Sequence, residues 1–177
     1  MKKILVLLIV TVLVVCIFPV SVFAGDERLG CNYGTPVGVV VETTEESLIS
    51  QYDFSSSLMQ HQRGLVDLSQ GYSSFVIGTL NSDATYTTDT YNITKSTIKI
   101  GLESFSGASQ HIKVTLYKST GESVAVSVIS VPVSNPANES TTYVSFTNLD
   151  TSYDYYAVIK NVSTTQSGLL LGIAKQV

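Results

Sequence analysis

Short apolar runs that alternate with polar residues fill the chain from residue 72 onward. Isoleucine, leucine and valine occupy every second position over 98–102, 112–116 and 124–128. Successive side chains of a strand point to opposite faces of a sheet, so this period predicts strands with one buried and one wetted face. Strands of this kind are typical of antiparallel sheets.

Turn-forming residues separate these runs. Ser119-Thr120-Gly121-Glu122 predicts a hairpin loop between two of the alternating strands. Further strands are expected around four shorter apolar runs: Phe75–Ile77, Val144 with Phe146, Tyr155–Ile159 and Leu169–Ile173. Repeated short strands at this spacing predict an all-β domain over residues 72–177, an antiparallel β-sandwich of the jelly-roll or fibronectin-like type.

The first 24 residues have the pattern of a cleavable bacterial-type signal peptide. Two lysines precede an almost purely apolar run over residues 4–18, and Val22-Phe23-Ala24 supplies a small-residue cleavage site. We therefore expect a secreted, extracellular protein, either free or associated with the cell surface, without stable membrane insertion after cleavage.

Two alternatives concern the same segment. A membrane anchor needs about 20 apolar residues, and this run ends sooner, before the helix-breaking Pro19. Lipidation of Cys16 would normally require Gly, Ala or Ser before it, and Val15 stands there. Cleavage after Ala24 is the interpretation that we favour.

Residues 25–71 are expected to be irregular or partly helical. Val37–Val41 suits a short strand. Thr43 followed three residues later by Glu46 matches the capping box that begins a helix. Residues 55–63 suit a second short helix, which Gly64 would end.

Charge and cysteine content narrow the classes of partner. The predicted signal contains two of the ten Lys and Arg residues and none of the 14 acidic ones, so cleavage changes the formal net charge from −4 to −6. An acidic protein is a poor candidate for binding nucleic acid, which selects basic patches. Cys31 is then the single remaining cysteine. Three states stay open for it: a buried thiol, a free thiol, or a disulfide-linked dimer.

Residues that commonly carry catalysis or bind metals are sparse. The two histidines, His61 and His111, are fifty positions apart, and no Gly-x-Ser-x-Gly motif is present. One cysteine and two distant histidines do not make a zinc site. Four loop aspartates suit either Ca²⁺ or ordinary turns: Asp83, Asp89, Asp150 and Asp154. We expect no enzyme activity, no cofactor and no metal.

Leu149 precedes Tyr155 by six positions, and Ala157 and Ile159 follow in alternation. This segment resembles the corner of fibronectin-type sandwiches, although the usual corner proline is absent. The resemblance implies structural roles for Leu149 and Tyr155, with the Tyr155 hydroxyl bonded to upstream backbone.

A second resemblance covers residues 95–177. Leu116-Tyr117 with Gly121 forms a hairpin motif, Tyr155-Tyr156 an aromatic pair, and Asn161 precedes a last strand led by Gly168. These features are similar to bacterial pre-peptidase C-terminal domains. The resemblance implies an accessory sandwich of the kind appended to secreted enzymes.

The sandwich region is rich in tyrosine. An exposed aromatic row would stack on sugar rings, whereas tyrosines that pack across strands would be structural. The function that we favour is a secreted, non-catalytic binding or surface-associated protein whose ligand is an extracellular protein or carbohydrate. The alternatives are a secreted inhibitor or toxin-like effector, and a small secreted hydrolase that uses His61 or His111.

Overall fold

The computed structural model describes residues 36–55, 64–105 and 107–177. The predicted signal peptide, Cys31, His61 and nearly all of the second predicted helix lie outside the described residues. No helix in the described ranges has both the length and the apolar character needed to cross a membrane.

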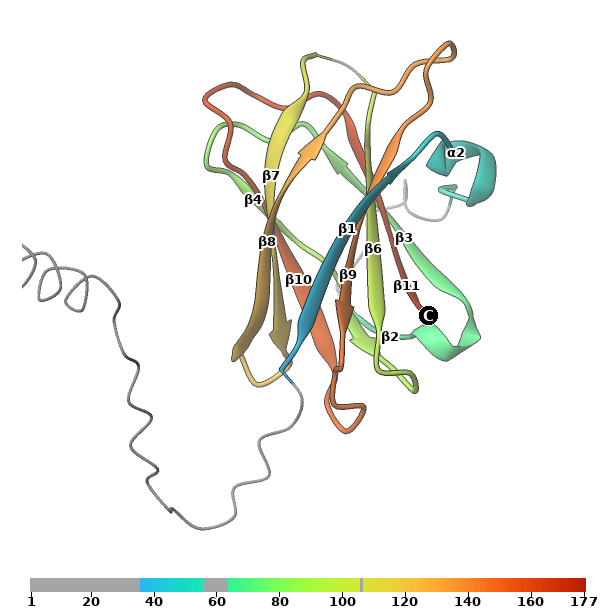
Figure 1. The fold of residues 1–177 in the computed structure, drawn as a ribbon, viewed down its shortest axis with the longest axis vertical. Helices are drawn as coiled ribbons and strands as arrows, with labels where there is room; N and C mark the ends of the chain where they lie inside the picture. Colours follow the sequence, from blue (N-terminus) through green and yellow to red (C-terminus); the bar gives the residue numbers. More distant parts are fainter. Residues whose placement is uncertain (1–35, 56–63, 106) are drawn as a thin grey trace, which may run out of the picture. The chain divides into compact units, whose positions relative to one another are not determined.

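Two sheets make up the described part of the chain (Figure 1). The five-stranded sheet has the order β1 (Gly38–Thr44), β9 (Thr141–Thr147), β6 (Ile98–Ser104), β11 (Leu170–Gln176) and β3 (Tyr72–Gly78). The six-stranded sheet has the order β2 (Leu65–Asp67), β5 (Thr90–Asn92), β10 (Tyr155–Asn161), β7 (Gln110–Lys118) and β8 (Ser123–Val131), and β4 (Thr85–Thr87) also pairs with β10. Every described pair is antiparallel except β2 with β5.

The strand pairs are nested around the β7–β8 hairpin. β6 pairs with β9, β4 and β5 pair with β10, and β3 pairs with β11. Successive pairs alternate between the two sheets, so one long antiparallel hairpin is rolled into two layers, which is the jelly-roll arrangement. The predicted antiparallel β-sandwich is confirmed, and its strand order is that of the jelly-roll rather than the fibronectin type.

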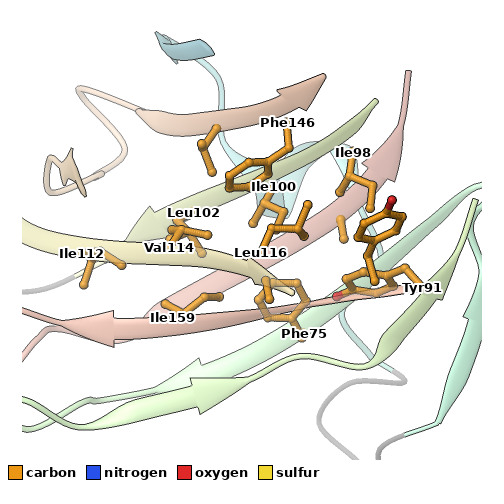
Figure 2. Packing of buried hydrophobic residues seen from close by; sticks show 14 of the residues in the cluster. Phe75, Tyr91, Ile98, Ile100, Leu102, Ile112, Val114, Leu116, Phe146 and Ile159 are labelled. Carbon is orange, nitrogen blue, oxygen red and sulfur yellow. The ribbon is translucent and has the colours of Figure 1, made fainter. Parts of the chain in front are cut away.

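The core lies between the two layers, as the alternation predicts. Ile98, Ile100 and Leu102 of β6 are fully buried. Figure 2 shows them beside the equally buried residues of β7, which are Ile112, Val114 and Leu116. Burying one such side chain contributes about 1.5–3 kcal/mol. The interdigitated residues of these two strands therefore hold the two sheets together.

β8 buries the face opposite to Val126 and Val128. Val126 and Val128 are 52% and 61% exposed, and they lie opposite Thr115 and Lys113 of β7 on the outer side of the sheet. Ala125 instead packs against the core. β8 is an edge strand, so the register with β7 decides which of its faces is buried, and the valine alternation does not.

The sheets also extend across the boundary that was predicted at residue 72. β1 pairs with β9 along all seven of its residues, and β2 pairs with β5. A short 3₁₀ turn, η2 (Leu68–Gln70), then leads into β3. The described part of segment 25–71 therefore contributes two strands to the sandwich.

The helix expected to begin at Thr43 begins later. Thr43 lies in β1, where the ladder to β9 keeps it extended, and its hydroxyl oxygen lies 3.2 Å from that of Thr142. The helix α2 (Leu48–Gln51) has Ser47 as its N-cap, and the Ser47 hydroxyl accepts a hydrogen bond from the Ile49 N–H at 3.3 Å. The predicted capping box at Thr43 and Glu46 is therefore wrong.

The β9–β10 connection contains the two residues singled out as structural. The Tyr155 hydroxyl donates a hydrogen bond of 2.8 Å to the Asp150 carbonyl oxygen, which is the bond to upstream backbone that the corner motif implies. Leu149 is buried, and its N–H donates to the Ser96 carbonyl at 2.8 Å. Burial raises the pKa of the Tyr155 hydroxyl.

Replacing Tyr155 with phenylalanine removes this hydrogen bond and keeps the buried ring. We expect the free energy of unfolding to fall by about 0.5–1.5 kcal/mol, the usual net contribution of one hydrogen bond. Urea denaturation measures the change. Tyr153→Phe is the matched control, because Tyr153 is an exposed tyrosine of the same corner. Equal losses in the two variants would contradict a specific role for the Tyr155 hydroxyl.

Candidate functional site

The outer side of the six-stranded sheet carries apolar and hydroxyl-bearing side chains over four neighbouring strands, with Lys113 and Lys160 next to them. Tyr156 and Val158 of β10 lie opposite Tyr117 and Thr115 of β7, and Val158 also lies opposite Thr87 of β4. Residues directly opposite in an antiparallel pair share one face of the sheet. We call this surface the tyrosine face, and it consists of Thr87, Thr115, Tyr117, Val126, Val128, Tyr156 and Val158.

The alternation along β10 places its two adjacent tyrosines on opposite faces. Tyr155, Ala157 and Ile159 are buried in the core. Tyr156 and Val158 are half-buried on the outer side. The same phase holds in β7, where Tyr117 follows the last core residue of that strand.

Tyr117 and Tyr156 stack on each other across the two strands. Their ring centroids are 5.2 Å apart and their planes differ by 10°. Such pairs contribute about 0.5–1.5 kcal/mol beyond the area that they bury. The stack fixes the orientation of both rings before any ligand arrives.

A hollow of about 670 Å³ opens beside Tyr156. On one side, β10 pairs with β4 along Val158–Lys160 and with β5 at Tyr155, and the hollow lies between these two pairings. Seven residues line it: Gly64, Leu65, Thr87, Thr88, Thr90, Tyr156 and Val158. None of the seven carries a charge, and three are threonines.

The turn at Thr88 and Asp89 creates this hollow. The Thr88 N–H donates to the Ala157 carbonyl at 3.0 Å, and the Thr88 hydroxyl accepts from the Ala157 N–H at 2.9 Å. A carboxylate oxygen of Asp89 accepts from the Gly64 N–H at 2.9 Å. These hydrogen bonds hold the backbone of the turn between β4 and β5. The turn leaves the hollow open on the outer side of the sheet.

Part of the outer side of the five-stranded sheet is covered by α2 and the residues after it. Leu48 of α2 packs with Tyr143 and Ile173 of the sheet, and Tyr52 and Phe54 join the cluster. Burial raises the pKa of the Tyr143 hydroxyl. These residues form a second small core on this side of the sheet.

A lysine and a buried glutamate of the sheet hold this cover in place. Lys175 of β11 donates to the Tyr52 hydroxyl at 2.8 Å. Glu103 is fully buried under α2, where one of its carboxylate oxygens accepts from the Leu48 N–H at 2.6 Å and from the Ser47 hydroxyl at 3.1 Å. These groups act within the fold.

The loop aspartates have structural partners. Asp83 forms an ion pair with Lys160 at 2.9 Å, and Asp154 accepts from the Asn92 amide at 2.9 Å. Hydrogen bonds from Ser152 lower the pKa of Asp150. His111 is exposed at the start of β7. Across the described ranges, no three His, Cys, Asp or Glu side chains gather as a metal site would require.

The tyrosines divide between packing and exposure. Tyr91, Tyr143 and Tyr155 are buried, and Tyr86 stacks on Phe75 with centroids 5.6 Å apart. Packing therefore accounts for these four. Tyr117 and Tyr156 are the two that point outward from the six-stranded sheet, and the sequence signals this. Tyr117 is out of step with the core residues of its run, and Tyr156 is out of step with those of β10.

No model of a known protein family matches this chain. No curated protein is significantly similar to it in sequence. The resemblance of residues 95–177 to pre-peptidase C-terminal domains, and that of the corner at Leu149 and Tyr155 to fibronectin-type sandwiches, therefore stay predictions.

Proposed function

We propose that the chain is a secreted, non-catalytic binding protein whose ligand lies on the tyrosine face. One observation carries the proposal: an open, preorganised surface with exposed valines, a fixed tyrosine stack and an uncharged hollow on a single sheet. Exposed apolar side chains that gather on one face of a soluble protein mark interaction sites. Export by the predicted signal peptide would place this surface outside the cytoplasm.

The strands of the sheet give this surface a rigid support. Binding residues held on strands keep their geometry better than residues on loops. Tyr117 and Tyr156 are held by the β7–β10 ladder, which pairs residues along the whole of β10. The ligand therefore meets groups whose orientation is already set, and less entropy is lost on binding.

A charge placed on this face tests the proposal. We expect Val126→Asp to weaken the binding of the purified protein to its ligand about tenfold, equivalent to about 1.4 kcal/mol. The new carboxylate must lose its hydration when the ligand covers this apolar surface. The measurement is binding to washed cell envelopes and to a printed glycan array.

Val40→Asp is the matched control. Val40 is 54% exposed, close to the 52% of Val126, and it also lies on an edge strand, but that strand belongs to the other sheet. Both variants should retain the stability of the parent within about 0.5 kcal/mol, as is usual for surface substitutions. The proposal fails if the parent protein binds neither the cell envelopes nor the glycan array. It also fails if Val126→Asp and Val40→Asp lose binding equally.

A further inference from the structure

The ring of Tyr156 has one covered face and one face toward the hollow. Tyr117 lies on the strand to one side of β10 and stacks on this ring at 5.2 Å. β4 and β5 lie on the other side of β10, and their residues Thr87 and Thr90 line the hollow together with Tyr156. The second face of the Tyr156 ring is therefore a wall of the hollow.

The lining combines aromatic surface with hydroxyl groups and lacks charge. The hydroxyl of Thr88 is engaged within the fold, because it donates to the Asp89 carbonyl at 2.8 Å and accepts from the Ala157 N–H at 2.9 Å. Thr87 and Thr90 supply further hydroxyls, and a hydroxyl both donates and accepts. A charged ligand would lose its hydration here without meeting an opposite charge.

Resting on the proposed function, we propose that the hollow binds one ring of a neutral oligosaccharide, stacked on Tyr156. A pyranose ring presents an apolar C–H face and a rim of hydroxyls, which match the aromatic wall and the threonines. The volume of about 670 Å³ lies within the roughly 300–1,000 Å³ common for small-molecule sites. Neighbouring sugar rings then lie along the tyrosine face.

Tyr117 is a positioning residue for this contact. It covers the far face of Tyr156 and prevents that ring from turning toward β7. The wall is therefore in place before the sugar binds, and less side-chain freedom is lost.

Calorimetric titration with defined sugars tests the inference. The neutral probes are hexamers of glucose, mannose, xylose and N-acetylglucosamine, and the acidic probe is a galacturonic acid hexamer. We expect at least one neutral hexamer to bind, Tyr156→Ala to weaken it about tenfold or more, and Tyr156→Phe to retain it because the ring remains. Thr87→Val, which removes a hydroxyl with little change of shape, should weaken binding less than Tyr156→Ala.

Tyr153→Ala is the control, because Tyr153 is exposed in the corner and lies outside the hollow. It should bind as the parent does. The inference is overturned if no neutral hexamer binds, if Tyr156→Ala binds unchanged, or if the acidic hexamer binds more tightly. A different result separates this inference from the proposed function: the protein binds cell envelopes, Val126→Asp weakens that binding, and no sugar hexamer binds. This result would keep the proposed function, overturn the sugar inference alone and favour a protein ligand.

Discussion

Gly172→Ala is expected to destabilise the sandwich by about 1–3 kcal/mol, the usual effect of overfilling a core. Gly172 of β11 faces the core, and a methyl group at this position would overlap the ring of Phe75 on β3. The ring of Phe75 also stacks on that of Tyr86, with centroids 5.6 Å apart, and this contact limits how far it can move away. Urea denaturation of parent and variant measures the loss.

The double variant Gly172→Ala with Phe75→Leu separates overlap from other causes. A smaller side chain at position 75 makes room for the methyl group, so the double variant should be more stable than the sum of the two single changes predicts. Coupling energies between contacting residues are about 0.5–3 kcal/mol. Simple additivity would show that the overlap with Phe75 is not the cause.

Glu103→Ala is expected to cost about 1.5–3 kcal/mol, the range for hydrogen bonds to charged groups. The change leaves the Leu48 N–H and the Ser47 hydroxyl without their buried acceptor. α2 should then lift from the sheet, and hydrogen exchange at the Leu48 amide should become faster. Chemical denaturation and amide exchange measure the two effects.

Glu103→Gln keeps an acceptor oxygen and should recover part of the loss. Glu46→Ala is the surface control, because the Glu46 side chain makes an exposed contact with Gln51 at 3.0 Å. Its effect should stay within about 0.5 kcal/mol. Unchanged protection of the Leu48 amide in Glu103→Ala would contradict the anchoring role of the carboxylate.

The strands of the sandwich were predictable because burial on one face imposes a period of two. The runs at 98–102 and 112–116 place every apolar residue in the core, and both strands lie where the pattern predicts. β8 shows the limit of this rule. Its valines alternate equally well, yet Val126 and Val128 point outward, since an edge strand has a smaller buried area to enforce its phase.

Parts of the candidate site depend on contacts between distant segments. The phase of β7 and β10 indicates that Tyr117 and Tyr156 leave the core, but their stacking requires the register between strands about forty residues apart. The hollow depends on the turn at Thr88 between β4 and β5. There the Thr88 hydroxyl, instead of a backbone carbonyl, accepts the hydrogen bond from the Ala157 N–H. No nearby sequence pattern predicts which strands pair with β10, and none predicts this turn at Thr88.

The nested order of strands also determines when the chain can acquire its structure. β3 pairs only after β11 is available, and β4 only after β10. Among the strands that the structure describes, the β7–β8 hairpin alone pairs segments that follow each other directly in the sequence. Pairings between distant segments form slowly. If such a chain is threaded N-terminus first through a narrow channel, β3 and β4 have no partner strands until β11 and β10 have followed. The layers close on the far side once the last two strands have followed, which makes this topology compatible with transport in the unfolded state.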